Sequence, residues 1–244
     1  MAQGFNVLDH LDYLRLRVLR AALWFVAAVV VAYFALTGRV MAYLIRGEGG
    51  LTGLVFLSPA EAFFSRLKLA FALGLVLALP FIAYQAWALF APGLDGKRRR
   101  AVLLLIPGAY LLFVGGCLFA FFVVLPLALR FFLSFGGEGL EQEISVGNYV
   151  DFLIRFVLPF GFLFELPVAV LVLARAGILS PRAMARNRKY AVFAIFVVAA
   201  LLTPPDAFSQ LMLAAPLLVL YEISIVLARI AAPGTAKGGG GTGG

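Results

Sequence analysis

The stretch GNYVDFLIRFVLPFGFLFELPVAVLVLARA, at residues 147–176, decides the fold. It is long enough to cross a bilayer as one helix, because about 20 apolar residues span the hydrocarbon core. It also carries a carboxyl group, Glu165, among Phe, Leu and Val. A charge there costs roughly 2.5 kcal/mol or more, so such a residue is neutral, paired or directed into a polar cavity. We interpret Glu165 as a candidate functional residue; the alternative is a buried Glu that serves packing only.

The composition extends this interpretation to the whole chain. Of the 244 residues, 64% are hydrophobic and only 13% are charged. Soluble domains are about 45–50% apolar and about 25% charged. Because the apolar runs are continuous and do not alternate, helices are favoured over a β-barrel. The sequence therefore predicts an all-α polytopic membrane protein.

The scarcity of cysteine and histidine excludes several kinds of site. Cys117 is the only cysteine and His10 the only histidine. Neither a disulfide framework nor a zinc site with several Cys or His ligands is possible. An intramembrane enzyme would need a nucleophile with a base, or a metal pair, and these two residues supply neither. We expect no catalytic residue, no metal and no cofactor.

Six apolar segments predict six membrane-spanning helices, the last two of them short. They lie at about residues 21–36, 57–90, 101–132 and 147–176, and in the two arms of 191–230, which TPPD at 203–206 separates. Most of the 20 basic residues precede the first segment, follow the second and fourth, or lie in the tail. Lys and Arg mark the cytoplasmic side, so both termini are expected in the cytoplasm. This distribution also favours membrane anchoring over nucleic-acid binding.

Three regions follow from this pattern. Residues 1–20 are expected to form a cytoplasmic amphipathic segment, residues 21–230 the six-helix transmembrane domain, and residues 231–244 a disordered Gly-rich cytoplasmic tail. Residues 38–53 are predicted to be a loop. No cleavable signal peptide is expected, because the early apolar run has no A-x-A-type site after it.

Two polar patterns suit helix starts. Ser58, Pro59 and Glu61 match a capping box with proline in the first turn. Asp206 can cap the last helix, as Asp commonly does; direct contact with cargo is the alternative.

Other polar residues lie within the apolar segments. Lys68 is expected to extend its amine toward the membrane surface, and Glu222 to pair with Arg229. Gln210 is a candidate polar neighbour of Glu165, and a simple helix–helix hydrogen bond is the alternative.

Five strings, in order along the chain, resemble those of the TatC family, the multispanning subunit of the twin-arginine protein translocase. They are HLDYLRLRVL at 10–19, LSPAEAFFSRLKLAF at 57–71, YQAWALFAPGL at 84–94, FGFLFELPV at 160–168 and LLTPPDAFSQLMLAAPLLVLYEISI at 201–225. The resemblance covers nearly the whole chain.

The resemblance implies a glove-shaped receptor of six helices in the cytoplasmic (inner) membrane, with short fifth and sixth helices. With TatB, it would recognise the twin-arginine signal peptides of folded proteins. It would recruit TatA for export driven by the proton-motive force, and form homo-oligomers within the receptor complex. No cofactor or nucleic acid is implied; the partners are these subunits, the cargo and membrane lipid.

The resemblance also implies site residues. The signal-peptide candidates are Asp12, Arg15, Leu94 and Asp95, and the intramembrane partner-binding candidates are Glu165 and Gln210. Further family positions are Pro59, Glu61, Lys68, Pro92, Asp206 and Glu222. The chain departs from the family at Tyr13 and Arg98, where the family usually has acids that receive the signal peptide's arginines. Asp12 and Asp95 are the nearby carboxylates that can pair with guanidinium groups.

Two alternatives stay open. A proton-coupled secondary transporter could use Glu165, Asp151 and Arg155 as a relay, although no inverted repeat is apparent. A purely structural scaffold would tolerate the loss of Glu165.

Overall fold

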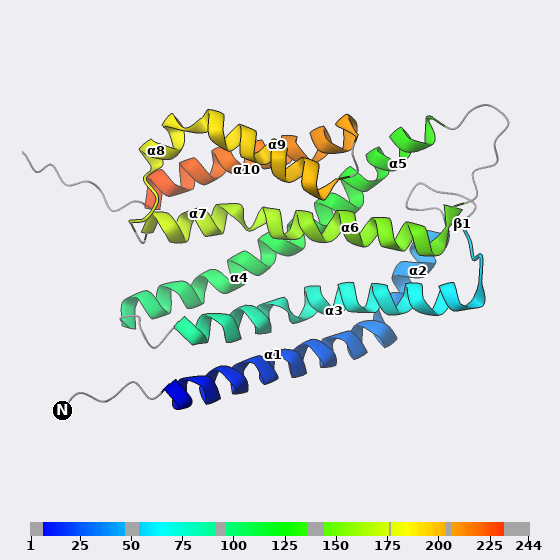
Figure 1. The fold of residues 1–244 in the computed structure, drawn as a ribbon, viewed down its shortest axis with the longest axis horizontal. Helices are drawn as coiled ribbons and strands as arrows, with labels where there is room; N and C mark the ends of the chain where they lie inside the picture. Colours follow the sequence, from blue (N-terminus) through cyan, green and yellow to red (C-terminus); the bar gives the residue numbers. More distant parts are fainter. Residues whose placement is uncertain are drawn as a thin grey trace, which may run out of the picture. The chain divides into compact units, whose positions relative to one another are not determined.

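The computed structural model describes residues 7–46, 54–90, 96–135, 144–175, 177–203 and 206–231, with the backbone alone for 7–13, 89–90, 96–104 and 231. The expected Gly-rich tail therefore lies outside the described residues, apart from the backbone of residue 231. The described chain is almost entirely helical (Figure 1). It divides into two compact units, residues 1–161 (unit 1) and 162–244 (unit 2), and the boundary falls within helix α6.

Unit 1 begins with two long helices that pack along each other, α1 (Val7–Ala35) and α3 (Pro59–Phe90) (Figure 1). The close approach depends on Gly74, where an added Cβ would lie 2.7 Å from the Cα of Val29. Small residues permit such contacts between helices in membranes. Trp24 and Phe81 stack further along the interface, with ring centroids 4.5 Å apart.

The prediction of a loop at 38–53 is wrong for its first part, because α2 (Thr37–Ile45) is helical. Gly38 and Arg39 suggested a loop, but the apolar residues that follow provide a helix with one buried face. Met41 and Leu44 pack into a core with Leu69 of α3 and Leu153 of α6. Burial of this face outweighs the low helix propensity of glycine.

The third apolar segment forms one long helical path with an irregular centre. Its parts are α4 (Gly96–Phe119), the π-helical η2 (Ala120–Val124) and α5 (Leu125–Leu133). Pro126 closely follows η2, and prolines and π-helical turns are both common at irregular points of a helix. The continuous path is long enough to cross a membrane.

A two-residue parallel ladder joins β1 (Leu54–Val55) to β2 (Ile144–Ser145). β1 shortly precedes α3, and β2 leads directly into α6 (Val146–Phe164). Because the strands are parallel, α3 and α6 begin at the same end of unit 1.

Unit 2 continues with α7 (Leu166–Arg175), α8 (Pro181–Arg186), α9 (Arg188–Leu202) and α10 (Ala207–Ala231). Gly177, with φ of +76°, ends α7 in the left-handed conformation that glycine favours. α9 and α10 form the predicted hairpin and pack against each other (Figure 1).

Five helical segments of the described residues are long and apolar enough to cross a membrane: Leu14–Ala35, Pro59–Ala88, Leu105–Leu133, Val146–Arg175 and Ala207–Ile230. α9 is shorter, with 15 residues, or roughly 22 Å at 1.5 Å per residue. The prediction that the last helix is also short is wrong, because α10 has 25 residues.

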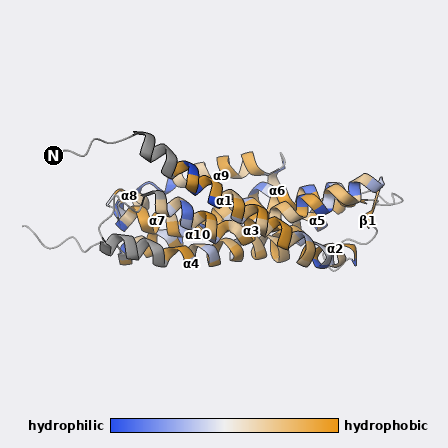
Figure 2. Cartoon of the chain, turned by 90° about the horizontal axis from the view of Figure 1, so that it is seen from below, coloured by the Kyte–Doolittle hydropathy of each residue, from blue (hydrophilic) through white to orange (hydrophobic). Residues whose placement is uncertain are grey.

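The surface of these helices is apolar, which suits contact with lipid. Phe34, Leu201 and Ile230 are each more than three-quarters exposed, at 81%, 79% and 78%. Hydrophobic residues predominate along α3, α4 and α10 (Figure 2). A soluble protein rarely exposes so many large apolar side chains, so the chain is a multi-pass membrane protein.

Candidate functional site

Glu165 lies at a break between two helices. α6 ends at Phe164 and α7 begins at Leu166. Pro167 explains the break, because it has no N–H to donate to the carbonyl of Leu163 and its ring opposes a regular turn there. The side chain of Glu165 is partly exposed, and it makes no hydrogen bond or ion pair with another described residue. A carboxyl group that bonds to no described residue, at an interrupted point of a membrane span, can bind an external polar group.

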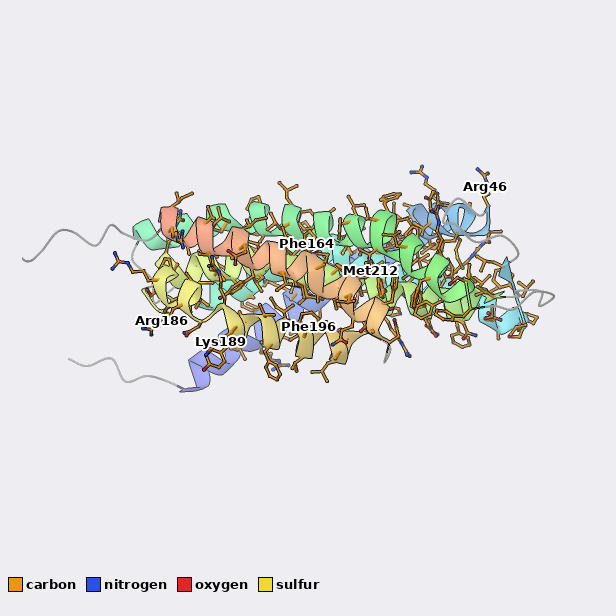
Figure 3. The ribbon with its side chains drawn as sticks, turned by 90° about the horizontal axis from the view of Figure 1, so that it is seen from above. Arg46, Phe164, Arg186, Lys189, Phe196 and Met212 are labelled. Atoms are coloured by element: carbon orange, nitrogen blue, oxygen red, sulfur yellow. The ribbon has the colours of Figure 1, made fainter. Side chains whose placement is uncertain are left out.

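Gln210 forms the helix–helix bond that was the alternative to contact with Glu165. Its Nε2 donates to the backbone carbonyl of Phe196, at 3.0 Å, and so joins α10 to α9. Figure 3 labels Phe196 along α9, beyond Arg186 and Lys189 where α8 passes into α9. Within the described residues, no hydrogen bond joins Gln210 to Glu165.

Asp206 caps α10, as the sequence predicts. Its Oδ1 accepts the backbone N–H of Ser209 at 2.7 Å. This bond satisfies one of the N–H groups that a helix start leaves without an intrahelical partner.

Glu222 pairs with a different arginine from the predicted one. Its Oε1 lies 2.7 Å from Nε of Arg188, and its Oε2 accepts from Nη2 of the same residue at 2.9 Å. The prediction of Arg229 is wrong, because it considered only α10 and the partner comes from the start of α9. The neighbouring Tyr221 donates to the carbonyl of Met184 at 3.1 Å, so this end of α10 is tied to both α8 and α9.

Glu61 performs two roles, of which the sequence predicts one. The capping box is present in part, because the N–H of Glu61 donates to Oγ of Ser58 at 3.2 Å. Its own Oε2 accepts the N–H of Leu57 at 2.7 Å. Its Oε1 accepts the N–H of Gly147, also at 2.7 Å, and the hydroxyl of Ser145. Glu61 therefore joins the start of α3 to the start of α6.

Lys68, whose amine the sequence predicts to extend toward the membrane surface, has a partner on α6 that this prediction did not include. Its Nζ donates to both carboxylate oxygens of Asp151, at 2.7 and 2.8 Å. This ion pair is a second connection between α3 and α6, and both side chains remain substantially exposed. The transporter alternative needs Asp151 as part of a proton relay, and in this structure the carboxylate of Asp151 is already bound by Lys68.

The candidate signal-peptide residues lie where the structure describes little. Pro92, Leu94 and Asp95 are outside the described residues, as is the side chain of Asp12, while Arg15 is exposed. Pro59, the remaining family position, is the first residue of α3.

The structure does describe the start of α1 and the end of α3, which lie near these positions in the sequence. Nη1 of Arg17 donates to Oε1 of Gln85 at 3.1 Å, which places the start of α1 beside the end of α3. The start of α1 and the end of α3 therefore lie at the same end of unit 1.

Sequence reasoning missed the partners that are distant along the chain. Ser145, Gly147, Arg188 and Gln85 carry no local motif that would reveal their bonds. Asp151 carried a signal, since an acid in a membrane span usually has a partner, but this did not identify Lys68. No group of three or more His, Cys, Asp or Glu side chains comes together within the described ranges.

Comparison with known proteins gives one consistent family. The family model described as "Sec-independent protein translocase protein (TatC)" matches residues 9–216. The TatC of Carboxydothermus hydrogenoformans is 42% identical over 229 residues, covering 93% of this chain and 94% of that protein. TatCy of Bacillus subtilis is 37% identical over 228 residues, covering 93% and 89%.

Solved structures agree with these relatives. A crystal structure of the twin arginine translocase receptor TatC has a TM-score of 0.74 and 36% identity, covering 91% of this chain and 99% of that one. A second, in DDM, has a TM-score of 0.76 and 38% identity, covering 90% and 99%. This chain therefore belongs to the TatC family of Sec-independent protein translocase components.

Proposed function

We propose that this chain is the subunit that recognises twin-arginine signal peptides of folded proteins. The family is a non-enzymatic one of protein translocase components, and the solved structures that the chain resembles are named as twin arginine translocase receptors. The transporter alternative has no comparable support, and Lys68 already engages Asp151.

The Arg17–Gln85 hydrogen bond carries the proposal of where the signal peptide binds. It joins the start of α1, where the sequence has Asp12, to the end of α3, which Asp95 follows along the chain. Two carboxylates there suit a pair of guanidinium groups, each of which a carboxylate can bind through two parallel hydrogen bonds. Arg15 and Leu94 complete the proposed surface. Asp12 and Asp95 would replace the acids that the family usually has at the positions of Tyr13 and Arg98.

Photocrosslinking tests this surface. Probes at Asp12, Leu94 and Asp95 should crosslink a twin-arginine precursor and crosslink its twin-lysine counterpart weakly. A probe at Leu57, which precedes α3 at its other end, is the matched control. Equal crosslinking of both precursors, or equal labelling at Leu57, would contradict the proposal.

In the proposed arrangement, the chain crosses the cytoplasmic (inner) membrane six times, with α9 as the short fifth span. Both termini lie in the cytoplasm. The distribution of Lys and Arg supports it. A reporter enzyme that is active only outside the cytoplasm, fused after Gly244, should be inactive, and the same reporter in the segment after Arg46 should be active. The reverse result would overturn this topology.

Glu165 is proposed to contact a polar group on TatA or TatB, the partner subunits in a Tat complex that contains several copies of this chain and uses the proton-motive force. Its partly exposed side chain at the α6–α7 break supports this role. Glu165→Ala should reduce export of a folded reporter while the protein stays folded, because no described residue depends on its carboxyl group. Unimpaired export would remove Glu165 from the mechanism.

A further inference from the structure

Unit 1 contains a charged groove between α3 and α6 that the proposed function does not use. It is lined by Lys68, Phe71, Asp151 and Arg155, with Ala72, Ile154 and Leu158 beyond them, and has a volume of about 330 Å³. Asp151 and Arg155 are four residues apart on α6 and therefore share one face of the helix.

The groove has an excess positive charge. Lys68 donates to both oxygens of Asp151, so these two charges compensate each other. Arg155 is exposed and has no hydrogen bond or ion pair to any residue in the described part of the chain. An anion beside Arg155 would meet one uncompensated guanidinium group, and the Asp151 carboxylate would repel it little because Lys68 already binds it. Guanidinium groups bind phosphate through paired hydrogen bonds.

An apolar cavity of about 290 Å³ adjoins the groove and shares Ala72, Ile154 and Leu158 with it. It continues deeper along α3 to Val76 and is closed on another side by Cys117 and Phe121. All its lining side chains are apolar. The π-helical η2 contributes Phe121 to this wall, and such irregular turns are frequent at functional sites.

The charged end of the groove lies at a suitable depth for a lipid headgroup. α3 has 32 residues, or roughly 48 Å, which exceeds a hydrocarbon core of roughly 30 Å. Lys68 follows Pro59 by nine residues, about 13 Å along the helix axis. A position so close to the end of an over-long helix lies near the boundary of the hydrocarbon core, where long basic side chains reach headgroups.

From these observations, we propose that this groove and cavity bind one anionic phospholipid. Its phosphate lies against Arg155, beside the Lys68–Asp151 pair, and one acyl chain enters the cavity toward Cys117 and Phe121. An acyl chain in the cavity makes van der Waals contacts with the apolar side chains of its wall, and these contacts stabilise binding.

The test uses the purified full-length chain in detergent, with phosphatidylglycerol carrying a photoactivatable diazirine in its acyl chain. Crosslinks mapped by mass spectrometry should concentrate on the cavity wall around Cys117 and Phe121. Phosphatidylcholine with the same diazirine keeps the phosphate but adds a positive choline group, which the excess positive charge of the groove repels, so it should label this wall about tenfold less. An even spread of crosslinks over the exposed faces of the helices would overturn the proposal, as would equal labelling by the two lipids.

Two variants identify the headgroup contact. Arg155→Gln should reduce phosphatidylglycerol labelling of the wall to the level of phosphatidylcholine. Arg66→Gln is the matched control, because Arg66 is also exposed but does not line the groove, and it should leave labelling unchanged. Equal losses in both variants would contradict a specific site. Inorganic phosphate at millimolar concentration should not displace the lipid; displacement would indicate an anion site without a lipid tail.

Discussion

The carboxylate of Glu61 accepts the backbone N–H of Gly147 at 2.7 Å, and this bond joins the first turn of α3 to the first turn of α6. The two residues are 86 positions apart. The parallel β1–β2 ladder lies beside the bond, and the Lys68–Asp151 pair follows further along the helices. Together these three connections fix how α3 and α6 run alongside each other.

Gly147→Ala should weaken this junction. The added Cβ would lie 2.8 Å from Oε1 and 2.9 Å from Cγ of Glu61, closer than real Cβ contacts. The carboxylate must move and would lose its bonds to Gly147 and Ser145, so the thermal unfolding midpoint in detergent should fall. Gly115→Ala is the control, because nothing lies within 4 Å of its added Cβ and alanine favours a helix by about 0.5–1 kcal/mol. Equal shifts in the two variants would show that the contact with Glu61 is unimportant.

Gly74→Ala should separate α1 from α3. Its Cβ would lie 2.5 Å from Cγ2 of Val29, 2.7 Å from its Cα and 2.9 Å from its N, and the backbone atoms cannot give way without moving α1. We expect a lower unfolding midpoint and weaker crosslinking between cysteines placed at Trp24 and Phe81, with Cys117 replaced by alanine. Val29→Ala should not rescue it, since the backbone clash remains. Rescue by Val29→Ala would mean that only the valine side chain resists the change.

The sequence predicted what depends on neighbouring residues. Apolar length located the membrane segments, and short-range polar patterns located the caps at Ser58 and Asp206, because a cap and its N–H donors are three residues apart. The break near Glu165 was not predicted, although a local rule, the effect of proline on the turn before it, could have revealed it.

The sequence could not predict contacts set by helix register. Arg188 is 34 positions from Glu222, and Lys68 is 83 from Asp151. Which charged faces meet depends on how helices rotate and cross, and burial of large apolar surfaces decides this. The same reason explains α2, whose helix depends on Met41 and Leu44 meeting a core from three other helices.

Pro167→Ala should make α6 and α7 continuous. Residue 167 would gain an N–H able to donate to the carbonyl of Leu163, so residues 163–169 should become more protected in hydrogen–deuterium exchange. If the break presents Glu165 to a partner, export should fall at the same time. Pro159→Ala is the matched control, because α6 continues through Pro159 without interruption. Increased protection with full export would show that the break itself is not required for function.

Asp206 is expected to act through its cap and not through its charge. Asp206→Asn keeps an oxygen that can accept the N–H of Ser209, so stability and export should match those of the original chain. Asp206→Ala removes the acceptor and should cost about 1 kcal/mol, seen as a lower unfolding midpoint and reduced export. Ser209→Ala is the control, since it keeps the backbone donor and removes only a buried hydroxyl that has no hydrogen-bond partner among the described residues. A stable Asp206→Asn protein that fails to export cargo would contradict this, and would show that the negative charge contacts a partner directly. Both side chains can accept the N–H of Ser209, so only a partner that interacts with the charge could distinguish them.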